Sequence, residues 1–176
     1  MSARKKLIAA FGMALCVMSL TACAEGPTDI RVTSVSDANF QAETELEWIS
    51  QKPRPSIVMS KIDFTTSTDL LALARAHDFN VDFAIGPCSK DGVKQSVGPY
   101  GGVFWGKGHI YSGTKDSEVP GYKDAIAKGP PYTYTVFVEK LPMNPPQPLC
   151  LTLAGGSMMG RKLKSNDAVI PTQTRQ

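Results

Sequence analysis

The side chains best suited to chemistry in this chain belong to four cysteines and two histidines. Cys88 and Cys150 are the cysteines that a fold could bring together, because two thiols in an oxidising compartment usually pair. Closing a loop of this length would stabilise the chain by up to about 4 kcal/mol. We therefore expect a Cys88–Cys150 disulfide, with two buried free thiols as the alternative. His77 and His109 do not form a ligand-spaced set with these cysteines, so no metal site is predicted.

The other candidates for catalysis have simpler structural explanations. His77 lies at the end of an expected helix, where an imidazolium favours the negative end of the helix dipole. Carboxylates two or four residues apart, such as Asp78 and Asp82, are typical of a solvated strand face. The glycine-rich segment before Ser157 is better explained as a turn than as a nucleophile elbow. Phosphate-loop, dinucleotide, calcium-loop and His-Glu-x-x-His motifs do not occur, so we predict a non-enzymatic protein that needs no cofactor.

The most suggestive binding stretch runs from Gly98 to Gly113, where aromatic side chains are interspersed with glycines. Exposed aromatic side chains on a loop can anchor a protein partner or stack on a sugar. The alternative is a core strand flanked by turns, with Phe104 or Trp105 buried. The candidate surface residues are Tyr100, Trp105, Lys107, His109 and Tyr111.

The N-terminal segment has the pattern of an export signal. Three cations at 4–6 precede the uncharged apolar run 7–20, which is shorter than the roughly 20 residues of a membrane-spanning helix. The run ends in Leu20-Thr21-Ala22-Cys23. This stretch resembles the lipobox of bacterial lipoproteins at each of its four positions. An ordinary secretory signal with a chance cysteine is the alternative.

The resemblance implies that residues 1–22 are removed and that Cys23 carries a diacylglyceryl thioether and an acylated amino group. Several acyl chains would hold the protein stably on a membrane. Ala24 stands where an Asp commonly signals inner-membrane retention. We therefore expect an anchor in the outer membrane, facing the periplasm, in a host with two membranes.

The charge of the chain changes with this processing. Three of its 19 basic residues lie before the predicted cleavage site, so the remaining 16 balance the 16 acidic residues. The formal net charge of +3 is thus a property of the segment expected to be removed. Neither a basic run nor a basic stripe remains, and nucleic acid is not an expected partner.

After processing, we predict a tether at 23–29, a single domain at 30–171 and a tail at 172–176. The chain is long enough for one domain with a hydrophobic core. Alternating patterns and proline or glycine breaks predict strands and one helix that begins after 67–69 and covers 70–76. The expected strands are 30–35, 40–48, 57–64, 79–85, 103–111, 132–138, 149–153, 158–164 and 167–170, with a turn at Gly155-Gly156 and loops at 89–102, 112–131 and 141–148.

This pattern predicts a mainly β fold, an antiparallel β-sandwich with at most one short helix. The spacing of Cys88 and Cys150 resembles an immunoglobulin-like plan, which is an analogy of architecture only. The membrane tether, the disulfide-bonded β domain and the lack of catalytic motifs predict a non-enzymatic module that binds another macromolecule. The expected partner is a protein of the envelope, bound by this chain as an inhibitor, an immunity protein or an accessory subunit of an assembly. Two alternatives remain open. One is a hydrolase of cell wall or lipid that uses His109. The other is a carbohydrate-binding module that uses Trp105 and Tyr111.

Overall fold

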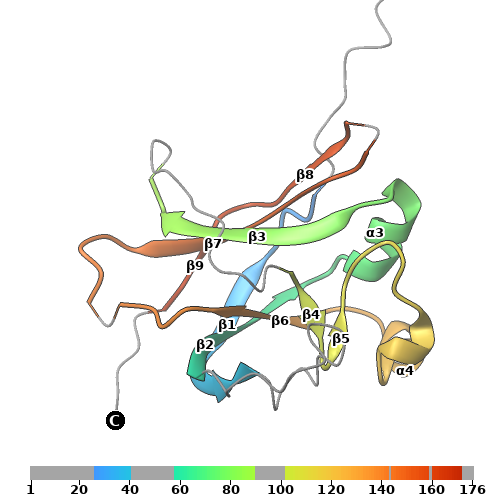
Figure 1. Cartoon of the computed structure of the whole chain (residues 1–176), viewed down its shortest axis with the longest axis horizontal. Coiled ribbons are helices and arrows are strands. Elements are labelled where there is room, and N and C mark those ends of the chain that lie inside the picture. Colours follow the sequence, from blue (N-terminus) through green and yellow to red (C-terminus); the bar gives the residue numbers. More distant parts are fainter. Residues whose placement is uncertain (1–25, 41–57, 90–101, 143, 159, 172–176) are drawn as a thin grey trace, which may run out of the picture.

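Strands are the main secondary structure, and they form two antiparallel sheets in a β-sandwich-like arrangement (Figure 1). The computed structural model describes residues 26–40, 58–89, 102–142, 144–158 and 160–171. The prediction of a mainly β, two-sheet fold is confirmed. The signal, Cys23, the last tail residues and the part of the expected strand that follows Phe40 lie outside these ranges.

The first sheet has the strand order β1-β2-β6-β4-β5. Ile62, in the middle of β2, lies between Val35 on one neighbouring strand and Val136 on the other. Cross-strand partners share a face, so these apolar side chains are turned toward the same side. The strands are β1 (Arg31–Asn39), β2 (Val58–Thr66), β6 (Tyr132–Val138), β4 (Phe104–Trp105) and β5 (Gly108–His109).

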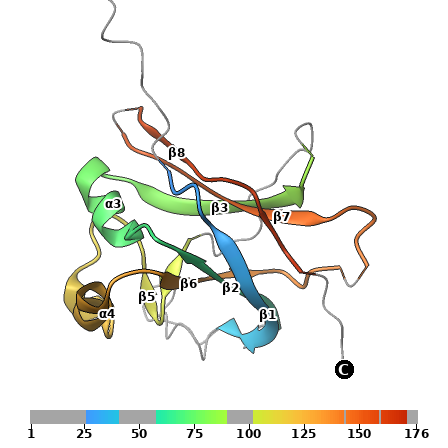
Figure 2. The same ribbon diagram turned by 180° about the vertical axis from the view of Figure 1, so that it is seen from behind.

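The second sheet has the order β3-β7-β8, and β9 also pairs with β7. Figure 2 shows β3, β7 and β8 as one layer above β1, β2 and β6. Phe83 and Leu153 are cross-strand partners and both are buried. The strands are β3 (Asn80–Pro87), β7 (Leu149–Gly156), β8 (Lys162–Lys164) and β9 (Ala168–Val169).

The main hydrophobic core lies between the two sheets. Phe64 and Tyr134 stack with ring centroids 5.6 Å apart, and both are fully buried. A smaller cluster of Phe40, Met59, Phe104 and Phe137 forms a second buried group. The central strand β6 contributes to both clusters, which explains why nearly all of its residues are buried rather than every second one.

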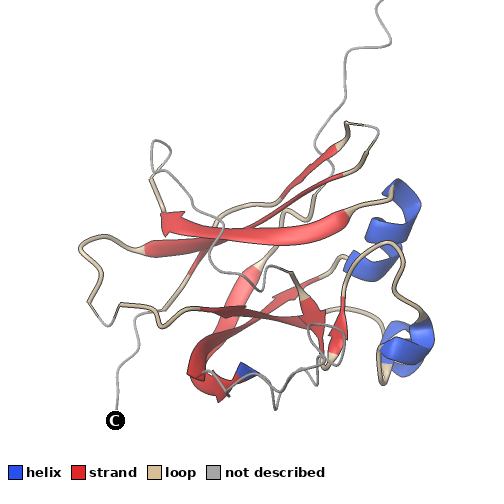
Figure 3. Ribbon diagram, viewed as in Figure 1, coloured by secondary structure: helices blue, strands red, loops and turns tan. Residues whose placement is uncertain are grey.

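The helix α3 (Leu70–His77) begins where the sequence predicts it. The Asp69 side chain accepts hydrogen bonds from the backbone N–H groups of Leu71 and Ala72, as an N-cap residue does. At the other end, His77 lies in the last turn. Figure 3 shows α3 and a second helix together at one end of the sandwich.

The prediction of at most one short helix is wrong, because α4 (Tyr122–Lys128) lies in the expected loop 112–131. The glycines and prolines at 120–121 and 129–131 flank this seven-residue segment instead of interrupting it. Tyr122, Ala125 and Ile126 have helical spacing and pack against the core. The Tyr122 hydroxyl also donates to Asp69 at 2.7 Å; burial and this bond raise the pKa of Tyr122.

The disulfide between Cys88 and Cys150 is present, with Cα atoms 5.0 Å apart. It joins the end of β3 to the start of β7, which are neighbours in one sheet. This differs from the immunoglobulin plan, in which the bridge crosses between sheets. The expected turn at Gly155-Gly156 is also wrong, since both glycines belong to β7 and the chain turns after them. Gly155 lies so close to the Asn80 carbonyl that any side chain would collide with it.

Candidate binding surface

The aromatic stretch predicted as a binding surface is divided between core and surface. Its expected strand 103–111 is a hairpin of β4 and β5, with Gly106 in the turn at φ +57°. The Trp105 side chain is only 9% exposed and packs against the rings of Tyr122, Tyr132 and Tyr134. Trp105 therefore belongs to the core, as the alternative interpretation of this stretch predicted. From this position its ring cannot stack on a sugar or anchor a partner.

His109 and Tyr111 lie beyond the turn and reach the surface. Their ring centroids are 5.5 Å apart, and Tyr111 is 37% exposed. Glycines make room for both rings, because a Cβ atom at Gly102 would collide with the imidazole and one at Gly113 with the phenol ring. We call His109 and Tyr111 the aromatic ledge. The glycines of this stretch thus serve the packing of the two rings.

Burial governs the protonation of His109. Desolvation lowers the pKa of its imidazole, and the negative charge of Asp82 partly opposes that shift. The ring also contacts Phe104, with centroids 5.2 Å apart. The ledge therefore offers a partner a neutral imidazole and a phenol ring near neutral pH.

The other predicted residues do not join one site. Lys107 is exposed in the hairpin turn, whereas Trp105 on the same hairpin is turned into the core. Tyr100 lies outside the described residues. Of the five predicted surface residues, the structure brings His109 and Tyr111 into contact with each other.

A pocket that the sequence analysis did not predict lies beside the start of β7. It has a volume of about 400 Å³ and is formed by the proline-rich connection after β6 and by the segment that follows β8. Its lining is more apolar than polar, and Asn144 and Gln147 are among the lining residues. We call it the proline pocket; it is lined by Leu141, Pro142, 144–149 and 169–171.

Both walls of the proline pocket are fastened to the second sheet. On one side, the Cys88 N–H donates to the Pro148 carbonyl at 3.0 Å, next to the disulfide. On the other side, the Ile170 N–H donates to the Leu149 carbonyl at 2.8 Å. Proline fixes its own φ angle, so the connection is also stiff within itself. The pocket is therefore a preformed feature with apolar walls.

A sequence signal for the proline pocket exists. Four prolines within 141–148 mark a stiff connection that cannot join a sheet, in the segment where the sequence predicts a loop. A pocket forms only where a second segment packs beside this connection. That segment is Val169, Ile170 and Pro171, more than 20 residues later in the sequence. The hydrophobic pattern of either segment does not reveal their pairing.

Within the ranges that the structure describes, no group of three or more His, Cys, Asp or Glu side chains is arranged to hold a metal ion. In the same ranges, no helix has the length and apolar character needed to cross a membrane.

Comparisons with known proteins assign no relatives to the chain. No protein-family model matches it, and neither curated proteins nor solved structures give a match. Functional inference therefore depends on the chain's own residues.

Proposed function

We propose that this chain is a lipid-anchored protein of the bacterial envelope whose β-sandwich is a non-enzymatic binding module for a protein partner. The proline pocket carries the proposal. In it we place an apolar side chain that protrudes from the partner, with the amides of Asn144 and Gln147 orienting the partner's backbone. An inhibitor and an assembly subunit would both use such a contact.

The rigidity of the proline pocket supports this proposal. Ordering a flexible side chain at an interface costs roughly 0.5–1.5 kcal/mol, and a wall of prolines avoids much of that cost. Pockets of several hundred Å³ with apolar walls and few polar groups are typical of sites that bind one compact group. Val169 lines the pocket and is 60% exposed, so it adds an apolar surface that a partner can reach.

Site-specific photocrosslinking in intact cells tests the binding module. A photoreactive residue replaces Val169 at the pocket rim, and a matched one replaces the exposed Lys128 on α4. We expect one discrete crosslinked protein from position 169 and none from position 128. Identical products from both positions, or none from either, would contradict a partner at the proline pocket.

Intact mass and cell fractionation test the anchor separately. We expect the mature protein to begin at Cys23, to carry acyl groups and to stay with the membranes, whereas Cys23→Ser is released from them. A wild-type chain without added acyl mass would exclude the anchor without touching the pocket. Hydrolysis of peptidoglycan or phospholipid by the purified chain, lost in His109→Ala, would replace the binding module with the hydrolase alternative.

A further inference from the structure

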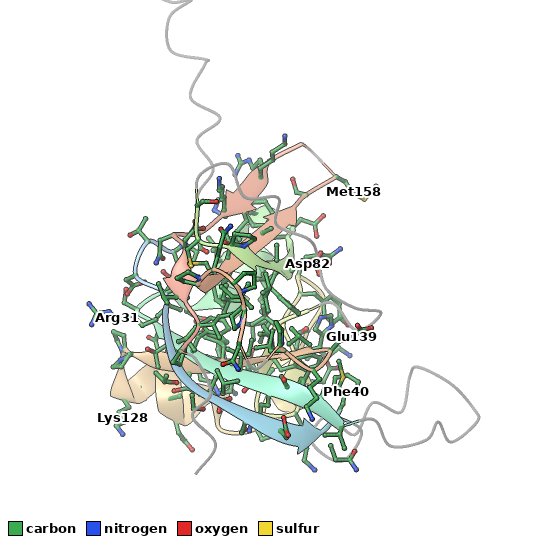
Figure 4. The ribbon with its side chains drawn as sticks, turned by 90° about the vertical axis from the view of Figure 1, so that its left-hand side faces the viewer. Arg31, Phe40, Asp82, Lys128, Glu139 and Met158 are labelled. Carbon is green, nitrogen blue, oxygen red and sulfur yellow. A yellow bond between two sulfur atoms is a disulfide. The ribbon has the colours of Figure 1, made fainter. Side chains whose placement is uncertain are left out.

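The hairpin between β7 and β8 projects from one end of the molecule. Its turn is closed by hydrogen bonds from Ser157 N–H to the Arg161 carbonyl and from Gly160 N–H to the Ser157 carbonyl, both 3.0 Å. Met158 in this turn is 97% exposed. Figure 4 shows Met158 at the upper end of the molecule and Phe40 and Lys128 at the lower end.

Cations follow directly after this turn. Arg161, Lys162 and Lys164 are all exposed, whereas Leu163 between them is buried in the core. The alternation places both lysines on the outer face of the sheet. Asp82 also faces outward, two strands away from Lys164 across Ala154, so it does not neutralise the turn itself. The hairpin therefore concentrates positive charge in a mature chain whose formal charges balance overall.

The start of the domain runs along the same hairpin. Asn166 accepts a hydrogen bond from the Ile30 N–H and donates to the Ile30 carbonyl, while its own N–H donates to Pro27. One residue earlier, Gly26 lies against the backbone of Lys164. Pro27 thus lies beside Asn166 and Gly26 lies beside Lys164. Followed toward its N-terminus, the chain therefore runs toward the β7–β8 turn.

The anchor proposed at Cys23 is only three residues before Gly26. Three residues span at most roughly 11 Å, a distance comparable to three residues of strand. Acyl chains on Cys23 would therefore enter the bilayer beside the hairpin and not beside the proline pocket. That pocket lies at the other end of β7, whose eight residues extend over roughly 25 Å.

We infer that the β7–β8 hairpin is a membrane-contact surface for anionic phospholipid, with Met158 entering the headgroup region and Lys162 and Lys164 facing the phosphates. Arg161, whose Nη1 lies 2.6 Å from His77 Nδ1, adds positive charge beside them. The inference rests on the proposed lipid anchor. Basic side chains close to an anionic leaflet are attracted to it, and this attraction decays within a Debye length. The contact fixes the orientation of the domain and directs the proline pocket away from the membrane.

Fluorescence of the lipidated mature protein, reconstituted in lipid vesicles, tests this contact. An environment-sensitive fluorophore is attached to Met158→Cys and, as a matched control at the other end of the same sheet edge, to Val169→Cys. On vesicles that contain phosphatidylglycerol, we expect the emission at position 158 to shift to shorter wavelength and that at 169 to stay unchanged. Vesicles of phosphatidylcholine alone, or salt near 1 M with a Debye length of about 3 Å, should weaken the shift.

Charge variants identify the cations responsible. Arg161→Gln/Lys162→Gln/Lys164→Gln should lose the shift at position 158, whereas the control Lys123→Gln/Lys128→Gln/Lys140→Gln, with the same change in net charge, should keep it. Equal emission at 158 and 169, or a shift indifferent to lipid charge and salt, overturns the hairpin contact in a chain that intact mass shows to be lipidated. A chain without lipid on Cys23 refutes the anchor and the inference together. The salt comparison needs no charge variant, so it decides even if that variant misfolds.

Discussion

The two ends of strand β7 are fixed in opposite ways. At its start, Cys150 is bonded covalently to Cys88 and the proline pocket is built on Leu149. At its other end, Gly155 lets the backbone of β3 approach closely, and a charged hairpin follows. One strand thus has an end fixed by a covalent bond and an end fixed by backbone packing.

Under the functions proposed above, this difference separates two tasks within a small domain. A recognition pocket needs walls that hold their shape before the partner arrives, and the disulfide and prolines provide such walls. A surface that lies on a membrane needs exposed charge and no defined shape. We therefore expect changes at the two ends to affect different properties.

The largest effect is expected from removal of the disulfide. Cys88→Ala/Cys150→Ala opens a crosslink between residues 62 apart in sequence, and the chain-entropy model gives a loss of about 4 kcal/mol in the free energy of unfolding. Urea unfolding measures this loss, and amide exchange should rise most around Leu149. A loss below about 1 kcal/mol, or exchange that rises equally at Gly156, would show that the start of β7 does not depend on the bridge.

At the glycine end, adjacent substitutions should differ in effect. A Cβ atom at Gly155 would overlap the Asn80 carbonyl oxygen, whereas the nearest contact of a Cβ atom at Gly156 would be the Arg161 carbonyl oxygen, 3.5 Å away. Gly155→Ala must push β3 away and should destabilise the domain by about 1–3 kcal/mol. Gly156→Ala should stay within about 0.5 kcal/mol of wild type. Urea midpoints that coincide for the two variants would disprove close packing at this end.

Loss of the side-chain bonds that hold the start of the domain should have a smaller effect. Asn166→Ala removes both side-chain hydrogen bonds to Ile30 and should reduce the free energy of unfolding by about 1–2 kcal/mol. Asn144→Ala, an exposed position in the proline pocket, is the control, with a change within about 0.5 kcal/mol. Amide exchange at Ile30 should rise only in Asn166→Ala; unchanged exchange there would mean that other contacts hold this segment.

Local patterns were sufficient to predict several of these elements. Strand 132–138 follows from alternation over seven residues, and the start of α3 follows from one capping side chain. The helix α4 was missed because its amphipathic pattern occupies only two turns between strong breakers. Its stability comes from non-local contacts such as that between Tyr122 and Asp69, which composition does not reveal.

The candidate sites were less predictable for a related reason. Which of Trp105 and Tyr111 is buried depends on the turn at Gly106, because a shift of one residue in a strand exchanges its two faces. The proline pocket depends on the packing of residues 169–171 beside a distant loop. The link between the cationic hairpin and the proposed anchor depends on the contact of Gly26 with Lys164, which the sequence does not reveal. Each feature needs a three-dimensional contact in addition to a sequence pattern.

The smallest expected effect concerns pH and sharpens the same comparison. Tyr111 forms an isolated antiparallel β-bridge with Asn80, and Asn80 is the cross-strand partner of Gly156. The aromatic ledge therefore borders the glycine end of β7. Burial lowers the pKa of His109 from 6.5, so below about pH 6.5 the unfolded chain binds more protons than the folded one and stability falls as the pH falls.

The variants His109→Phe and Asp82→Asn test this dependence from opposite directions. His109→Phe keeps an aromatic ring but cannot titrate, so its free energy of unfolding should fall less than that of wild type between pH 7 and 5. Asp82→Asn removes the charge that raises the pKa of His109, so its stability should fall more steeply. Amide exchange, corrected for its intrinsic pH dependence, should report acid weakening near Asn80 and none near Leu149. Equal weakening at both sites would show that protonation of His109 acts on the whole domain, and that the glycine end of β7 is not a separate unit.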